Sequence, residues 1–272
     1  MRKLYSLFWV RGKTLVNYVR RAPYFGAVWP WLLAGLVQTR MLKGEKAGRI
    51  LVPLGKREKQ KVWLDLGSAQ QRDVFQEVLV ERNYPLERVP FSPALIVDCG
   101  ANVGFFSSLA RVRFPGARIV AWEANAKNFG VLQSQPALQG EQVELYQAAV
   151  SDRDGEGYFK GEGAGGRLEM DNPGEGTQTV KVVDLLGWWK KNKTPSTLWK
   201  IDVEGHETIL IPSLEKKWVK PCALFLETHE KDGNDHQLIN LIKAEGFQIN
   251  LLKEHELSGD PRIFREYIGI QK

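Results

Sequence analysis

Charged side chains gather where an apolar segment ends in the second half of the chain. Lys200, Asp202 and Glu204 follow the run Thr197-Leu198-Trp199 and precede Gly205. Ligands of an open parallel sheet bind beyond the carboxyl ends of its strands, so these side chains should reach one binding cleft. Burying several charged groups at a strand end costs free energy that a fold does not require. The pattern therefore predicts a working site rather than a solvated surface.

A second apolar segment should bring two more polar side chains to the same rim. The run Cys222-Ala223-Leu224-Phe225-Leu226 precedes Glu227 and His229. An imidazole whose pKa lies near the working pH can act as a general base, and neighbouring carboxylates can orient its ring. We expect His229 to be the base and Asp202 to be the second candidate. The alternative interpretation of His229 is a structural histidine with its hydrogen bonds satisfied.

The carboxylates of this rim admit two roles. Glu204 and Glu227 either orient an acceptor hydroxyl or, together with Asp202, hold a divalent cation that lowers the pKa of that hydroxyl. Cys99 and Cys222 lie in separate apolar runs without metal-ligand spacing, which is typical of core thiols in a reducing compartment. We therefore predict no required metal ion and keep a divalent cation as the weaker alternative.

The first half of the chain contains a motif that predicts a nucleotide-shaped pocket. The run 95–99 is typical of a buried parallel strand, and the turn at 100–104 should lead into a helix that begins at Val103. Glycines in this turn let the backbone bend sharply and let a ligand approach closely. The candidate cofactor-binding residues here are Asp98, Gly100, Ala101, Asn102 and Gly104.

An acid at the end of the next strand points to a ribose. The run Arg118-Ile119-Val120-Ala121-Trp122 predicts a strand that ends at Glu123, 19 residues after Gly104. An acid about 20 residues beyond such a glycine turn binds ribose hydroxyls in nucleotide-binding folds. A third strand at 142–147 should bring Ala149 and Asp152 to the adenine edge, and turn chemistry is an equal alternative for Asp152.

The glycine turn favours S-adenosylmethionine over a dinucleotide. A dinucleotide fingerprint has the pattern G-x-G-x-x-G and holds a pyrophosphate, whereas Gly100-Ala101-Asn102-Val103-Gly104 lacks the second glycine. Asp98 would repel a pyrophosphate but can face an ammonium group. Because S-adenosylmethionine has an amino-acid end and a sulfonium, it fits this turn better than NAD does.

Charge divides the chain of 272 residues into two unlike parts. Residues 1–61 contain fourteen Lys and Arg side chains and two acidic ones, whereas the rest of the chain has more acidic than basic side chains. We predict a basic, aromatic-rich helical extension over 1–48, a cap of the cofactor cleft over 49–93, and a Rossmann-like domain over 94–272. Within this domain, the glycine-rich stretch 153–180 predicts a flap with a mobile tip beside the cleft.

The extension over 1–48 has three interpretations. Its basic and aromatic side chains suit an anionic membrane surface. A cap docked on the main domain is the alternative, and nucleic-acid contact is unlikely because the predicted catalytic part is acidic. The most apolar run, 26–37, contains Pro30 and is shorter than the about 20 residues of a membrane span. We therefore expect a cytoplasmic protein, with peripheral contact to the inner membrane face as the hypothesis for this extension.

Several of these segments together resemble the FkbM-type family of S-adenosylmethionine-dependent methyltransferases. The string Lys200-Ile201-Asp202-Val203-Glu204-Gly205-His206-Glu207 is the most specific part of the resemblance. Trp122-Glu123-Ala124 departs from the aromatic-Glu-Pro pattern of that family, and the basic extension lies outside the similarity. The resemblance spans roughly residues 60–270 and is carried by 97–104, Glu123, 149–152, 200–207 and 226–229.

The resemblance implies an α/β fold with a doubly wound, mostly parallel seven-stranded sheet whose last strand is antiparallel. It implies that the cofactor binds at the ends of the first three strands. It also implies methyl transfer to an oxygen of a sugar, glycan, glycolipid or other small natural product as the acceptor. Two other classes stay open: an RNA methyltransferase that uses the basic arm, and a non-catalytic module that binds an adenosyl ligand. The sequence specifies no oligomeric state.

Overall fold

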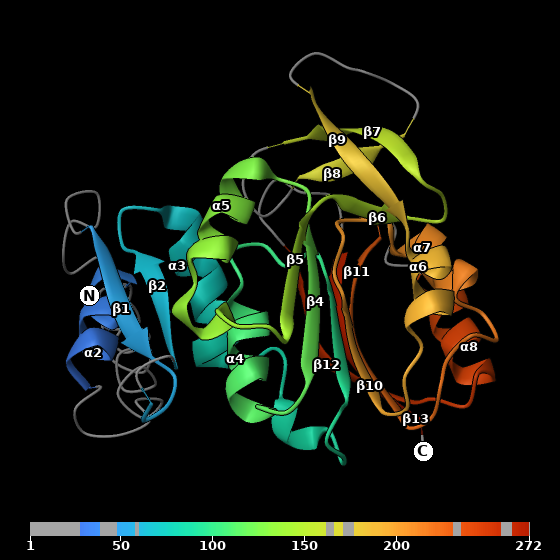
Figure 1. Ribbon diagram of the computed structural model, residues 1–272, viewed down its shortest axis with the longest axis horizontal. Coiled ribbons are helices and arrows are strands. Elements are labelled where there is room, and N and C mark those ends of the chain that lie inside the picture. The colour runs from blue at the N-terminus through green and yellow to red at the C-terminus, as the bar shows by residue number, and fades with distance from the viewer. Residues whose placement is uncertain are drawn as a thin grey trace, which may run out of the picture.

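A seven-stranded sheet runs through the centre of the structure (Figure 1). The computed structural model describes residues 28–38, 48–57, 60–161, 166–170, 177–230, 235–256 and 263–271. Across the sheet, the strands are β12 (Gln248–Glu256), β13 (Ile263–Gln271), β11 (Cys222–Glu230), β10 (Thr197–Ile201), β3 (Leu95–Cys99), β4 (Arg118–Glu123) and β5 (Val143–Gln147). Strands β11 to β5 run parallel, and β13 runs antiparallel to both of its neighbours. The predicted α/β sheet with an antiparallel last strand is confirmed.

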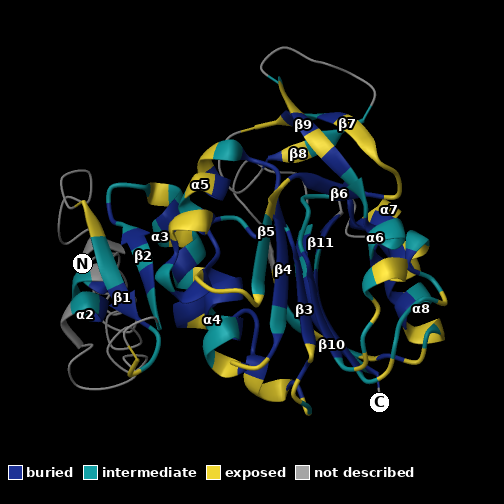
Figure 2. Cartoon of the chain, in the orientation of Figure 1, coloured by how far each residue is buried: buried dark blue, intermediate teal, exposed yellow. Residues whose placement is uncertain are grey.

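Helices cover both faces of this sheet. On one side lie α3 (Ala69–Phe75), α4 (Phe105–Arg113) and α5 (Ala126–Ser134), and on the other lie α6 (Leu185–Asn192), α7 (Glu207–Ser213) and α8 (His236–Ala244) (Figure 1). Side chains alternate along a strand, so Ile96 and Phe225 pack with the first layer whereas Val97 and Leu224 pack with the second. Figure 2 shows the result as a band of buried strands at the centre of the molecule.

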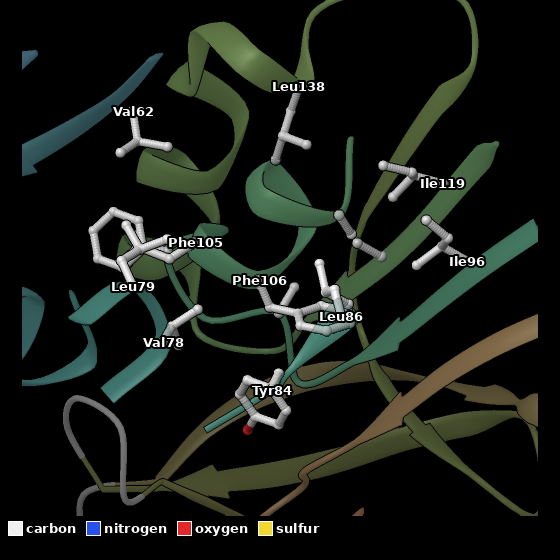
Figure 3. Packing of buried hydrophobic residues seen from close by; sticks show 14 of the residues in the cluster. Val62, Val78, Leu79, Tyr84, Leu86, Ile96, Phe105, Phe106, Ile119 and Leu138 are labelled. Carbon is white, nitrogen blue, oxygen red and sulfur yellow. The ribbon is translucent and has the colours of Figure 1, made fainter. Parts of the chain in front are cut away.

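Apolar packing fixes the strand ends that carry the polar residues. Every residue of β3 is buried, as expected for a parallel strand covered on both faces. Phe105 and Phe106 at the start of α4 project into the core, Phe105 beside Leu79 and Phe106 beside Leu86 (Figure 3), in the cluster that also contains Ile96. Burial of apolar surface stabilises by roughly 25 cal/mol per Å², so each fully buried aromatic ring contributes several kcal/mol before entropy is counted. The charged residues beyond the strands are thus attached to a rigid base.

The N-terminal part of the described chain packs against the first helical layer. Helix α2 (Val28–Gln38) lies beside the hairpin of β1 (Arg49–Pro53) and β2 (Lys61–Asp65) (Figure 1). Trp31 is buried, lies 5.2 Å from Phe75 between ring centroids, and donates its indole N–H to the carbonyl oxygen of Pro53 at 3.2 Å. This described portion of the 1–48 extension is therefore docked on its own domain.

The hypothesis that the extension contacts a membrane concerns residues outside α2. All of its basic side chains fall in 1–27 and 39–47, which lie outside the described residues. Among the described residues, no helix has both the length and the apolar character needed to cross a membrane. Contact of the extension with an anionic membrane stays a prediction.

The cap between the hairpin and the central sheet places one tyrosine over the strand ends. Helix α3 continues as the π-helix η3 (Gln76–Glu81), and the chain leaves it at Arg82 with a positive φ of 62°. A short 3-10 helix, η4 (Leu86–Arg88), follows. Tyr84 lies between these two elements, with its ring edge-on to Phe106 at 5.2 Å and to Phe225 at 5.7 Å. Figure 3 shows its hydroxyl pointing away from the apolar cluster.

A second, smaller sheet lies over the carboxyl ends of the parallel strands (Figure 1). Its order is β6 (Ala149–Ser151), β9 (Thr177–Asp184), β7 (Gly155–Lys160) and β8 (Arg167–Glu169). The sequence predicted a hairpin or flap at 153–180. The structure shows more, because β9 returns parallel to β6 and ties the flap to the central fold. The predicted mobile tip falls in 162–165 and 171–176, outside the described residues.

Candidate active site

The turn after β3 adopts left-handed backbone conformations that its glycines permit. Gly100 has φ of +80° and Gly104 has φ of +85°, and Gly104 caps the N-terminus of α4. Because of this cap, α4 begins at Phe105 rather than at the predicted Val103. A Cβ atom on Gly100 would collide with the backbone oxygen of Asp202. The turn and the rim residue Asp202 are therefore packed directly on each other.

Replacing Gly100 with Ala is expected to lower the free energy of unfolding by about 2 kcal/mol or more. The side chain would be strained at this φ and would push against backbone rather than a flexible side chain. A urea unfolding curve measures the change. Gly130→Ala is the matched control: it lies in α5 with open space around its Cβ position, so it should stabilise by about 0.5–1 kcal/mol. Equal stability of the two variants would contradict the expectation.

One buried ammonium group connects the turn with the rim. Lys200 is 4% exposed, and its Nζ donates to the carbonyl oxygen of Gly100 at 2.8 Å. The same Nζ lies 3.0 Å from Asp202 Oδ2 and 3.6 Å from Asp98 Oδ1. Burial alone would lower the pKa of Lys200, but the carboxylates of Asp202 and Asp98 outweigh it and raise the pKa. The lysine stays charged and acts as a structural tie.

Asp98 lies beneath the turn rather than at the surface of the pocket. Its side chain is fully buried, and Oδ2 accepts a hydrogen bond from Ser107 Oγ at 2.5 Å. Burial raises the pKa of this carboxyl group, and Lys200 opposes the rise. We expected Asp98 to face the ammonium group of the cofactor. The structure instead places it where it holds Lys200 and the first turn of α4.

A cavity opens between the central strand ends and the small sheet, and it spans about 590 Å³ including its mouth. Predicted residues contribute backbone and side chains to its lining: Gly100, Asn102, Glu123, Ala149, Asp202 and Glu204. Trp122, Phe159 and Leu168 add apolar surface. Two of these come from β7 and β8, so the small sheet forms one wall of the cavity.

Glu123 lies at the position expected of a ribose-binding acid. Its two carboxylate oxygens each accept a backbone N–H: Oε2 from Asn102 and Oε1 from Asn125, both at 2.8 Å. Burial raises the pKa of Glu123, and the two backbone hydrogen bonds oppose the rise. Each oxygen of a carboxylate has a second lone pair, so a fixed pair of acceptors remains for a vicinal diol. These two acceptors therefore fit the ribose hydroxyls of S-adenosylmethionine.

The predicted adenine contact is only partly reproduced. Ala149 lines the cavity, whereas Asp152 is exposed and accepts a hydrogen bond from Ser151 Oγ at 3.1 Å. Ser151 Oγ also lies 2.8 Å from Nε2 of His206, a buried residue that lines the cavity. Burial lowers the pKa of His206, so this imidazole is neutral at pH 7. Sequence analysis assigned no role to His206, although this residue lies inside the most specific motif.

The imidazole of His229 sits inside a ring of carboxylates. Nδ1 lies 3.1 Å from Glu207 Oε1. Nε2 lies 3.5 Å from Glu204 Oε2, 3.6 Å from Glu227 Oε1 and 3.8 Å from Asp202 Oδ1. The predicted rim residues are thus brought together, as the parallel strands require. Sequence analysis assigned no role to Glu207, because its place beside the ring depends on the turn at 203–205.

The protonation of His229 differs from the expected one. Burial would lower its pKa, but Glu207, Glu204 and Glu227 outweigh burial and raise it to about 10. A general base needs a pKa near the working pH, so the ring in the ligand-free protein does not supply the near-neutral pKa that we expected. The second candidate, Asp202, is also a weak base, because Lys200 and His229 outweigh its burial and lower its pKa.

Tyr84 closes the rim from the cap side. Its Oη lies 3.2 Å from Asp202 Oδ2 and 3.4 Å from Glu227 Oε2. Burial, followed by the charge of Asp202, raises the pKa of Glu227 well above its ordinary value. Burial raises the pKa of Tyr84 as well, so the phenol stays a hydrogen-bond donor. The arrangement can hold hydroxyl groups by several acceptors at once.

Comparison with known families gives a match over more than half of the chain. The family described as "Methyltransferase FkbM domain" matches residues 98–249. Methyltransferase sdnD of Sordaria araneosa is 25% identical over 219 residues, which cover 65% of this chain and 82% of that protein. The 31-O-demethyl-FK506 methyltransferase FkbM of Streptomyces tacrolimicus is 22% identical over 221 residues, covering 68% of this chain and 84% of its own length. The matched region contains both the cavity and the rim.

Solved structures give weaker similarities of the same kind. Methyltransferase FkbM from Methylobacillus flagellatus KT superposes with a TM-score of 0.44 and 12% identity, over 94% of this chain and 58% of that one. Precorrin-6y C5,15-methyltransferase from Geobacter metallireducens GS-15 gives a TM-score of 0.42 and 12% identity, over 71% of this chain and 88% of that one.

Proposed function

The chain belongs to the FkbM methyltransferase family, and from this membership we propose that it methylates a hydroxyl oxygen of a sugar, glycan, glycolipid or other small natural product. The family uses S-adenosylmethionine. The cavity has acceptors for its ribose in the carboxylate of Glu123, which the backbone of Asn102 holds in place. The acceptor class is the part that we propose. Its support comes from the rim rather than from the cofactor pocket.

The observation that carries the proposal is the concentration of carboxylates at the end of the cavity. Asp202 and Glu204 line the cavity, and Glu227 lies 3.6 Å from the imidazole that they share. Carboxylates accept hydrogen bonds from hydroxyl groups and orient them. The negative charge of Asp202, which stays ionised, would repel the phosphates of a nucleic acid. A neutral acceptor with several hydroxyl groups fits this rim better than RNA does.

The residues of the site have separable roles in such a reaction. When bound, S-adenosylmethionine supplies a methyl group on a positively charged sulfur, which an oxygen nucleophile can take. Glu123 would hold the ribose, and Gly100 lets the cofactor turn pack against the backbone of Asp202. Asp202 stays ionised beside Lys200 and can accept a hydrogen bond from the acceptor hydroxyl, which aligns its oxygen. As the acceptor oxygen takes the methyl group, the carbon–sulfur bond would break, S-adenosylhomocysteine would leave, and the hydroxyl proton would pass to Asp202.

A labelled-methyl experiment tests the acceptor class. The full chain is incubated with S-adenosylmethionine carrying a ¹³C methyl group and with panels of polyhydroxylated small molecules or with RNA. We expect S-adenosylhomocysteine by mass spectrometry and a methyl ether signal by NMR with a hydroxylated acceptor. The matched deoxy acceptor should give neither signal. Methylation of RNA, or of nitrogen, would overturn the proposal, and cofactor binding without turnover on any panel would favour a binding module.

A further inference from the structure

We infer that His229, Asp202, Glu204 and Glu227 form a binding site for a divalent transition-metal ion at the end of the cavity. The ligand atoms would be Asp202 Oδ1, Glu204 Oε2, Glu227 Oε1 and His229 Nε2, whose proton the ion would displace. The role of the ion, activation of an acceptor hydroxyl, rests on the proposed function. The existence of the site does not.

The imidazole nitrogen Nε2 is the first observation. The side chain of His229 is 1% exposed, and Nε2 is buried with no hydrogen-bond partner. Three carboxylate oxygens face it at 3.5, 3.6 and 3.8 Å. These separations are too long for hydrogen bonds, and an unsatisfied buried polar atom calls for an explanation.

The distances around Nε2 supply that explanation. Ligand atoms that share a tetrahedral ion, at bonds of about 2.1 Å, lie roughly 3.4 Å from one another. The distances from Nε2 to Glu204 and Glu227 are close to this value, and the distance to Asp202 is slightly longer. Asp202 and His229 also belong to a group of potential ligand atoms within 4.8 Å of one another, whose third member is Glu207. In our proposal Glu207 holds the other face of the imidazole, and the three carboxylates around Nε2 bind the ion.

The opposite atoms of three of these side chains are already held. Nδ1 of His229 contacts Glu207 Oε1 at 3.1 Å. Asp202 Oδ2 lies 3.0 Å from Lys200 Nζ, and Tyr84 Oη lies within 3.4 Å of both Asp202 Oδ2 and Glu227 Oε2. Metal-binding histidines and carboxylates characteristically have such outer partners, which orient the ligand atoms. In these three side chains, the other polar atom faces the proposed site.

Glu207 is a positioning residue in this arrangement. It is 1% exposed, and its carboxylate accepts the backbone N–H groups of Val203 at 2.8 Å and Gly205 at 2.9 Å. These bonds fix the turn in which Glu204 adopts a positive φ of 57°. Strained backbone of this kind is characteristic of functional sites. One carboxylate therefore orients the imidazole and the turn that carries Glu204.

The donor set selects the kind of ion. Ca²⁺ and Mg²⁺ take oxygen ligands, whereas an imidazole nitrogen combined with carboxylates suits Mn²⁺, Fe²⁺ or Zn²⁺. Such an ion would also offset the mutual repulsion of the clustered carboxylates. Placed beside the cavity, it can lower the pKa of a coordinated acceptor hydroxyl, which makes the oxygen a better nucleophile.

Mn²⁺ binding to the full chain tests the site without cofactor or acceptor. We expect calorimetry to give one ion per chain, and pulsed electron paramagnetic resonance to detect coupling of Mn²⁺ to an imidazole nitrogen. His229→Gln should abolish the nitrogen coupling and weaken binding at least 100-fold. Glu207→Gln should weaken binding about 10- to 100-fold and keep the coupling. Glu156→Gln, an exposed acid on β7, is the matched control and should change neither.

The outcomes separate the metal site from the acceptor proposal. Failure to bind Mn²⁺ and Zn²⁺, or binding that His229→Gln leaves unchanged, would overturn the site whatever the enzyme methylates. Metal binding without hydroxyl methylation would leave the site standing and contradict the acceptor class. Circular dichroism checks that each variant is folded, and Glu204→Gln, with an expected loss of at least 100-fold in affinity, replaces His229→Gln if that variant does not fold.

Discussion

Replacing Glu123 with Ala should weaken S-adenosylmethionine binding by at least about 100-fold. Two charge-assisted hydrogen bonds to the ribose would be lost, each contributing roughly 1.5–3 kcal/mol. The backbone N–H groups of Asn102 and Asn125 would lose their acceptor as well, so the glycine turn would be less well ordered. Calorimetric titration with S-adenosylmethionine and with S-adenosylhomocysteine measures the change.

Two further variants test whether the loss of affinity comes from the carboxylate of Glu123. Glu123→Gln keeps one oxygen acceptor and the shape of the side chain, so its affinity should lie between wild type and Glu123→Ala. Glu144→Ala removes an acid from the neighbouring strand β5, where it pairs with Arg118 at 2.6 Å outside the cavity, and should leave the affinity unchanged. Binding by Glu123→Ala that equals wild type would mean that the ribose lies elsewhere.

Replacing Lys200 with Met should lower the free energy of unfolding by about 3–5 kcal/mol. Removing one partner of a buried ion pair leaves an uncompensated charge, and here both Asp98 and Asp202 would lose their ammonium partner. The carbonyl oxygen of Gly100 would also lose its donor. Urea unfolding followed by circular dichroism gives the free energy by linear extrapolation.

A double variant distinguishes charge from packing in this result. Adding Asp98→Asn to Lys200→Met removes one of the unpaired carboxylates. The double variant should therefore lose less free energy of unfolding than the two single variants lose together. Lys181→Met, at an exposed position on β9, should change stability by no more than about 0.5 kcal/mol. A loss below about 1 kcal/mol in Lys200→Met would show that the carboxylates are solvated or protonated.

The sequence predicted the rim because parallel strands end on the same edge. Lys200, Asp202, Glu227 and His229 follow apolar runs of similar length, so their meeting required only that β10 and β11 be neighbours, which they are. Glu123 was predictable from its offset to the glycine turn. These inferences depend on chain order and on topology, and both are encoded locally.

Other features depend on register and side-chain direction, which the sequence does not specify. Asp98 is the Cα partner of Lys200, and the pleat turns both toward the α4 layer, so Asp98 supports the turn instead of facing a ligand. The pKa of His229 depends on how many carboxylates converge on it. Glu207 could not be assigned as one of them before the turn at 203–205 was known.

Lys200 couples the cofactor turn to the carboxylate rim. One ammonium group contacts the backbone of the cofactor turn at Gly100 and the carboxylate of Asp202 at the rim. An ion or substrate that draws Asp202 away from Lys200 changes the hydrogen bond that steadies the turn. If cofactor binding changes the affinity of the rim for its ligand by some factor, binding at the rim must change the affinity for the cofactor by the same factor. Ordered or cooperative substrate addition would then originate in a single side chain.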